Sequence, residues 1–184
     1  GGDGGLGKTS LWCNIASAIS NGTPCVLQEN NDFLYPQGEV IYFSGEDDTA
    51  RVLRDRLEQN GANLDNIKPL PMDDDAFTSL SIGGALIEGI IEARRPMLVI
   101  FDPIQQFIKN ADMSKRNDMR QIMTNLSKLG KKYGTTFILV MHTNKRDKIG
   151  SFRDKLSDSA DLWDIVRSVI ALGRNQNNEN FITH

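Results

Sequence analysis

The segment that most constrains the fold is Gly2-Asp3-Gly4-Gly5-Leu6-Gly7-Lys8-Thr9. It fits the pattern of a phosphate-binding loop, in which a glycine is followed by four residues and then by glycine, lysine and threonine. Such a loop leads into a helix, and apolar Leu11, Ile15 and Ile19 follow it at helical spacing. Asn21-Gly22 then predicts the end of this helix. The alternative, a flexible glycine-rich turn, would not require a periodic helix directly behind it. The segment therefore predicts an α/β protein that binds phosphate groups.

The residues of this loop also predict the ligand and the metal. Glycines let backbone N–H groups turn inward around phosphates, and the helix behind the loop adds its positive end. Lys8 would then reach the terminal phosphates, and the Thr9 hydroxyl would ligate Mg²⁺. The sequence thus predicts ATP and Mg²⁺ as cofactors, with nucleotide contacts from Gly2, Gly4, Gly5, Leu6, Gly7, Lys8, Thr9 and Ser10.

Strand patterns and helix patterns alternate along the rest of the chain. Apolar and β-branched runs predict strands at 40–43, 67–70, 97–101, 137–141 and 166–172. Helical periodicity predicts helices around 52–57, 86–91 and 119–133. Because such alternation favours a mostly parallel sheet with helices on both faces, we expect one α/β domain over residues 1–184.

Two carboxylates follow predicted strands. Asp102 ends the apolar run 97–101, and a carboxylate there can hold Mg²⁺ directly or through water. Its alternative role is to cap the turn before Pro103. Glu46 follows the strand at 40–43, where it could orient the water that attacks the γ-phosphate or simply cap the next helix in solvent.

His142 follows the predicted strand at 137–141. A histidine in that place can sense the γ-phosphate, although a lone histidine at a strand end is more often only hydrogen-bonded. Both roles stay open on the residues alone.

The overall composition excludes a generally basic nucleic-acid coat. The chain has 21 basic and 24 acidic residues, for a formal net charge of -3, so any contact with nucleic acid must come from a local patch. Cys13 and Cys25 have neither metal-ligand spacing nor the density of a disulfide scaffold, which favours a reducing cytosol. No apolar run is long enough to cross a bilayer, so we expect a soluble cytoplasmic protein without membrane contact.

The phosphate-binding loop lies at the very start of the sequence, although such a loop normally follows a buried strand. We therefore expect the sequence to be a fragment of a longer protein, with its N-terminal strand missing.

Together these segments resemble the RecA-like ATPases, particularly the hexameric plasmid and phage replication helicases related to RepA, over nearly the whole chain. The family strand that ends in the catalytic base is similar to Ile41-Tyr42-Phe43-Ser44-Gly45-Glu46-Asp47, and its Mg²⁺ strand is similar to Leu98 to Pro103. Its sensor strand, in members that use histidine, resembles Val140-Met141-His142-Thr143-Asn144-Lys145. The resemblance implies Glu46 as base, Asp102 as Mg²⁺ ligand and His142 as γ-phosphate sensor. It also places the missing strand between the strands at 137–141 and 166–172.

The resemblance extends to an arginine that acts in a neighbouring subunit. The family segment that leads into this arginine is similar to residues 158–167, although its usual glycine and paired serines are reduced to Asp158-Ser159-Ala160. Arg167 is then an arginine finger, and the implied assembly is a homo-oligomer, a hexameric ring. The alternative is a surface arginine on an edge strand.

A cluster of basic residues follows His142 and consists of Lys145, Arg146, Lys148, Arg153 and Lys155. The resemblance makes this segment the loop that faces the central pore of the ring, where single-stranded DNA passes. Basic side chains there would give salt-sensitive binding that is largely independent of base sequence. A solvated loop, balanced by Asp147, Asp154 and Asp158, is the alternative.

The sequence as a whole predicts the ATP-hydrolysing motor domain of a plasmid, phage or mobile-element replication helicase. One alternative is a RecA-like recombination or regulatory ATPase that does not unwind duplexes. Another is a nucleotide-binding switch with negligible turnover. Glu46 argues against the switch, because a protein that only binds nucleotide does not need a poised base.

Overall fold

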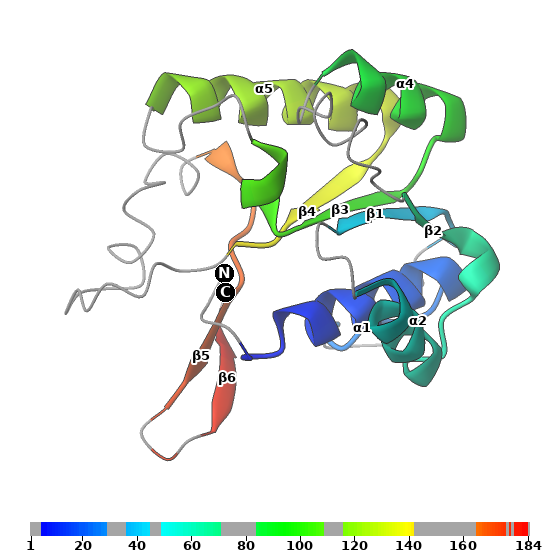
Figure 1. Cartoon of the computed structure of the whole chain (residues 1–184), viewed down its shortest axis with the longest axis vertical. Coiled ribbons are helices and arrows are strands. Elements are labelled where there is room, and N and C mark those ends of the chain that lie inside the picture. The colour runs from blue at the N-terminus through cyan, green and yellow to red at the C-terminus, as the bar shows by residue number, and fades with distance from the viewer. Residues whose placement is uncertain are drawn as a thin grey trace.

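The computed structural model describes residues 5–28, 36–44, 49–70, 84–108, 116–141, 165–175, 177 and 179–183. Its centre is a four-stranded parallel sheet with the order β2-β1-β3-β4 (Figure 1). The strands are β1 (Val40–Ser44), β2 (Ile67–Pro69), β3 (Leu98–Asp102) and β4 (Thr136–Leu139). The predicted parallel sheet is therefore confirmed.

Helices cover both faces of this sheet, as the sequence predicts. One layer holds α1 (Lys8–Asn21) and α2 (Thr49–Gln59), and the opposite layer holds α4 (Ala85–Arg94) and α5 (Arg116–Tyr133) (Figure 1). Short 3-10 helices, η1 (Leu64–Asn66) and η2 (Ile104–Phe107), precede β2 and follow β3. The order of helices and strands is that of an α/β RecA-like core.

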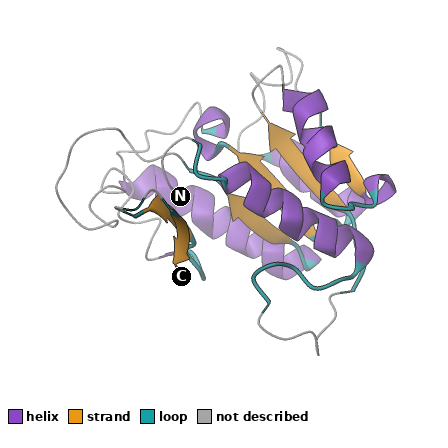
Figure 2. Cartoon of the chain, turned by 90° about the horizontal axis from the view of Figure 1, so that it is seen from below, coloured by secondary structure: helices purple, strands orange, loops and turns teal. Residues whose placement is uncertain are grey.

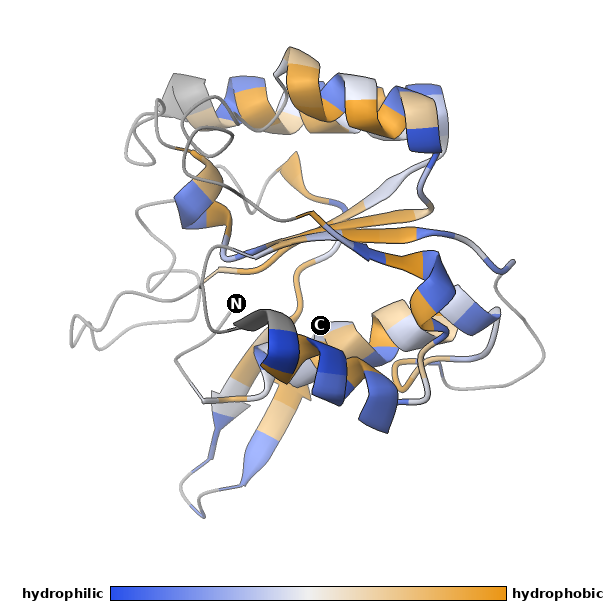
Figure 3. Ribbon diagram, turned by 45° about the vertical axis from the view of Figure 1, so that its right-hand side comes forward, coloured by the Kyte–Doolittle hydropathy of each residue, from blue (hydrophilic) through white to orange (hydrophobic). Residues whose placement is uncertain are grey.

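Alternate residues of the two central strands enter two separate hydrophobic clusters, because side chains of a strand point to opposite faces in turn. Phe43 and Phe101 face α4 and α5, and their paired rings stack 4.8 Å apart. Tyr42 and Ile100 face α1 and α2. Both strands are buried along their apolar residues, and the sheet is mainly hydrophobic in Figure 3. This double burial explains why β1 and β3 are uninterrupted apolar runs.

The first helix ends where the sequence predicts a stop. Gly22 follows Asn21 with φ 70° and donates its N–H toward Ala18 and Ile19 carbonyls. This left-handed conformation costs a residue with a side chain about 1 kcal/mol or more, which is why glycine suits the position.

The strand predicted at 166–172 is wrong in position and in partner. The chain forms β5 (Ala171–Arg174), which pairs antiparallel with β6 (Asn180–Thr183) in a hairpin apart from the main sheet (Figure 2). Residues 166–170 are not in a strand. A strand needs a hydrogen-bonding neighbour within about 5 Å, and a cavity separates this stretch from β4.

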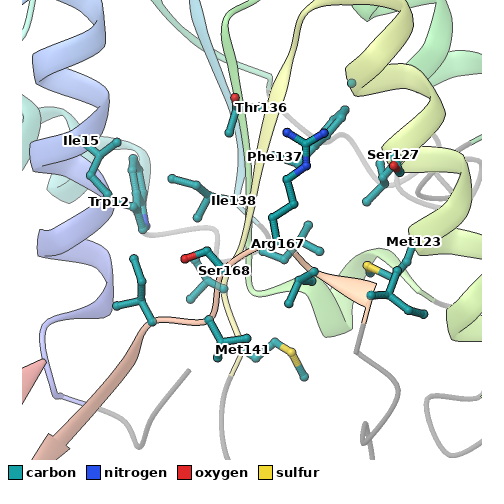
Figure 4. Close-up of a pocket in the computed structure, with 18 of the residues that line it drawn as sticks. Trp12, Ile15, Met123, Ser127, Thr136, Phe137, Ile138, Met141, Arg167 and Ser168 are labelled. Carbon is teal, nitrogen blue, oxygen red and sulfur yellow. The ribbon is translucent and has the colours of Figure 1, made fainter. Parts of the chain in front are cut away.

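That cavity, which we call the β4 groove, is about 750 Å³ in volume. Its walls are α1 and α5, its floor is β4, and residues 165–170 close its far side (Figure 4). Within the described part of the chain, β4 pairs with β3 alone, and its apolar side chains are half-buried where those of β3 are buried. The groove thus lies between β4 and the segment 166–172.

The described helices include none that is both long and apolar enough to cross a membrane. Cys13 is buried and Cys25 is half-buried, and both thiols are free.

Candidate nucleotide-binding site

The described part of the phosphate-binding loop is shaped by its glycines. Gly5 has φ 76° and Gly7 has φ 88°, both in the left-handed region. A Cβ atom at either position would meet nothing within 4 Å, so backbone conformation rather than lack of space requires glycine there. Gly2 and Gly4 lie outside the described residues.

The start of α1 suits an anion. Gly7 is the N-cap residue and has no side chain that could accept a hydrogen bond from the first-turn N–H groups. The first turn also has no acidic residue that would occupy the positive end of the helix. These features leave the helix terminus suited to phosphate oxygens, as the loop pattern predicts.

Lys8 begins the helix and is 9% exposed. Leu6 is also buried, while Ser10 is exposed. A lysine is seldom this deeply buried unless its charge has partners. Its position directly behind Gly7 agrees with the predicted role toward the terminal phosphates.

Asp102 is brought to this helix from the carboxyl end of β3. The Thr9 hydroxyl donates a hydrogen bond to Asp102 Oδ2 over 3.2 Å, although the two residues are 93 positions apart in the sequence. A hydroxyl and a carboxylate are the oxygen donors that Mg²⁺ prefers, so this pair fits the predicted metal. The capping role considered for Asp102 does not account for this contact with α1.

The carboxyl end of β1 lies beside this pair. Ser44, the last residue of β1, is opposite Asp102 in the parallel register, and Glu46 follows Ser44 by two positions in the chain. Glu46 and His142 lie outside the described residues, as do Lys145, Arg146, Lys148 and Arg153. Their roles therefore stay predictions.

Trp12 is a residue of the site that the sequence patterns did not single out. Its indole Nε1 donates a hydrogen bond of 2.7 Å to Asp102 Oδ2, and its side chain is almost completely buried. The available signal was its spacing, because Trp12 lies three residues after Thr9 and therefore on the same helix face. The apolar periodicity of the helix points instead to Leu11, Ile15 and Ile19.

Two titratable side chains beneath the site are held neutral. Burial raises the pKa of the Cys13 thiol to about 12, with the Arg56 charge lowering it and the Asp102 charge raising it. Burial also raises the pKa of Tyr42, and the nearby Cys13 raises it further. Neither group supplies charge to the site near neutral pH.

Arg167 lies on the far side of the β4 groove. It is exposed, and its side chain is directed into the groove beside Phe137 (Figure 4). The alternative for Arg167 was a surface arginine on an edge strand. Arg167 is at the surface, but residues 166–170 form no strand, so the strand in that alternative is wrong. Its role in a neighbouring subunit stays a prediction.

The fold and this site define a P-loop ATPase, with a glycine-rich loop, a helix that starts behind it, and a strand-end carboxylate hydrogen-bonded to the loop threonine. A family model described as AAA domain matches residues 1–148. Since the match covers most of the sequence, the chain belongs to the AAA domain family. A search of curated proteins found no match.

Proposed function

We propose that this chain is the ATP-hydrolysing motor domain of a replicative DNA helicase of plasmid, phage or mobile-element origin, working as a homo-hexameric ring on single-stranded DNA. The observation that supports it best is the hydrogen bond from Thr9 to Asp102 at the carboxyl end of the sheet, directly behind the phosphate-binding loop. The helicase assignment rests on the resemblance to RepA-type enzymes.

In this proposal the described residues bind the nucleotide and its metal. The N–H groups at the start of α1 hold phosphate oxygens, and Lys8 neutralises charge on the terminal phosphates. Thr9 and Asp102 would hold Mg²⁺, which when bound neutralises phosphate charge during hydrolysis. Burial of Lys8 and the apolar neighbours of Asp102 strengthen these electrostatic interactions, because fewer water molecules screen them.

Three further residues complete the proposed reaction. Glu46 accepts a proton from the attacking water, and His142 contacts the γ-phosphate. Arg167 stabilises the charge that develops at the nucleotide of a neighbouring subunit. Arg167 is exposed, as a residue that contacts another protomer must be before assembly.

DNA binding is assigned to the basic cluster after His142. Its side chains neutralise phosphates of the strand and release counterions, so binding weakens as the salt concentration rises. The overall charge of -3 makes a local cluster necessary for such binding.

The test is ATP hydrolysis, single-strand binding and unwinding of a forked DNA duplex by the full-length protein. We expect DNA-stimulated hydrolysis and ATP-dependent strand separation, both abolished in Lys8→Ala. Alanine at Lys145, Arg146 and Lys148 should weaken single-strand binding and reduce its salt slope by about 0.7 for each DNA phosphate that is no longer neutralised.

Each competing function gives a different outcome. Hydrolysis without strand separation would assign the chain to the recombination or regulatory ATPases. Tight ATP binding without turnover would identify the chain as a nucleotide-binding switch. An unchanged salt slope in the alanine variant of the basic cluster would indicate that this cluster is a solvated loop that does not bind DNA.

A further inference from the structure

We infer that Trp12 is a positioning residue, which orients the Asp102 carboxylate toward the metal of the nucleotide complex. This inference rests on the proposed function of the site. It is carried by the 2.7 Å hydrogen bond from the indole Nε1 to Asp102 Oδ2, across 90 positions of sequence.

The geometry gives the two oxygens of Asp102 different tasks. Trp12 and Thr9 both donate to Oδ2, and Thr9 does so over 3.2 Å. Two donors from one helix face, converging on one oxygen, fix the rotation of the carboxylate about its Cβ–Cγ bond. Oδ1 is then the oxygen that these two bonds leave to a metal or to its water shell.

Packing alone does not account for a tryptophan at this position. The ring is 2% exposed and lies against Tyr42, with ring centroids 5.6 Å apart and an interplanar angle of 38°. Phenylalanine would make a similar aromatic contact without placing a polar N–H in the interior, where an N–H without an acceptor is costly. The buried N–H has its acceptor in Asp102, and a hydrogen bond to a charged acceptor is stronger than one to a neutral group.

The bond also couples two elements that must act together. The phosphate-binding loop leads into α1, while the carboxylate belongs to β3. Trp12 ties the first turns of α1 to the end of β3, so both groups proposed for the metal are held in register before nucleotide arrives. Partners that orient a metal ligand typically change metal affinity 10- to 100-fold when removed, so we expect a change of about that size.

The test compares Trp12→Phe with the wild-type protein, and Tyr42→Phe is the matched control because it changes the same aromatic contact without touching the indole N–H. A fluorescent ATP analogue is titrated in EDTA and over a range of Mg²⁺ concentrations. For Trp12→Phe we expect the Mg²⁺ concentration at half-maximal effect to rise about 10- to 100-fold, with affinity in EDTA unchanged. Tyr42→Phe should follow the wild type. Wild-type Mg²⁺ dependence in Trp12→Phe would overturn the inference.

A second measurement does not need the nucleotide. The chain has two tryptophans, so a Trp163→Phe background leaves Trp12 as the fluorescent reporter. In that background Asp102→Asn should shift the Trp12 emission, since it removes the charged acceptor of the indole. An unchanged emission would overturn the inference even if Trp12→Phe failed to fold.

The two proposals fail in different ways. If the wild-type protein does not bind the ATP analogue, the proposed function is wrong. A shift of Trp12 emission in Asp102→Asn would then show that the Trp12–Asp102 hydrogen bond exists but orients no metal ligand, so the positioning role would be wrong too. If ATP binds normally but Trp12→Phe keeps its Mg²⁺ dependence, only the positioning role is wrong.

Discussion

A strand added in front of the phosphate-binding loop should stabilise the protein and tighten ATP binding. The perturbation is an N-terminal extension of about five apolar, β-branched residues joined to Gly1, which is an ordinary strand length. The β4 groove offers the place, because it lies between α1 and α5 and its floor is the edge of β4 that pairs with no other described strand. An added strand parallel to β4 would end at the same edge of the sheet as β4, beside the phosphate-binding loop.

The expected gain follows from the hydrogen bonds of β4. Thr136 donates to Met97 O over 2.8 Å and Val140 donates to Phe101 O over 2.9 Å, so these residues face β3. By alternation, the backbone groups of Phe137, Leu139 and Met141 face the groove. Pairing their N–H groups at about 1 kcal/mol each gives about 3 kcal/mol, or roughly 6–12 °C in Tm for a chain of this size. The free energy gained by burying the apolar side chains of the added strand and the free energy lost by ordering its backbone oppose each other and are of similar size. The hydrogen bonds therefore set the expected gain.

The assay is a thermal melt by circular dichroism, with an ATP titration of each protein. The control extension has the same length but carries proline wherever an N–H would face β4, because proline cannot donate to a ladder. We expect a higher Tm and tighter ATP binding with the first extension only. Equal melting temperatures for the extended, control and unextended chains would show that the β4 edge does not accept a strand, and the reasoning from the groove would be refuted.

Two further predictions concern single residues. Glu46→Gln should keep ATP affinity but lower the rate of phosphate release by about 10² or more, because the amide cannot accept a proton from water; a wild-type rate would place the base elsewhere. Cys13 should resist iodoacetamide at pH 8 while Cys25 is labelled, because a thiol of pKa about 12 is only ~10⁻⁴ thiolate there and stays largely neutral until the pH approaches that value. Mass spectrometry of the native and the urea-unfolded protein measures this, and equal labelling of both cysteines in the native protein would contradict the burial of Cys13.

The identity and order of the main elements were readable from the sequence. The run from Leu98 to Phe101 was predicted as a strand covered on both faces, and β3 confirms it. The Asn21-Gly22 pair marked the end of α1 correctly. The glycine pattern predicted a loop whose backbone N–H groups turn inward around phosphates, and Gly5 and Gly7 have positive φ angles that glycine adopts readily. These features depend on neighbours within one helical turn or one strand, where steric and hydrogen-bonding preferences act locally.

The burial of individual helix residues was less predictable. Val52 and Leu53 both marked α2 in the sequence, yet Val52 is 46% exposed and Leu53 is 2% exposed. Adjacent positions on a helix differ by about 100°, so the side that packs on the sheet decides between them.

The contacts of the site depended on tertiary structure in the same way. Spacing placed Asp102 at a strand end, but it did not show that Trp12 and Thr9 share its Oδ2, because their partner lies 90 or more positions away. The segment 166–172 had strand-forming residues and still formed no strand before Ala171, because the β4 groove separates it from β4. The sequence alone determined the local conformations and the chemical groups. Only the packing of the sheet against the helices decided which distant groups meet, because these contacts join residues that are far apart in the sequence.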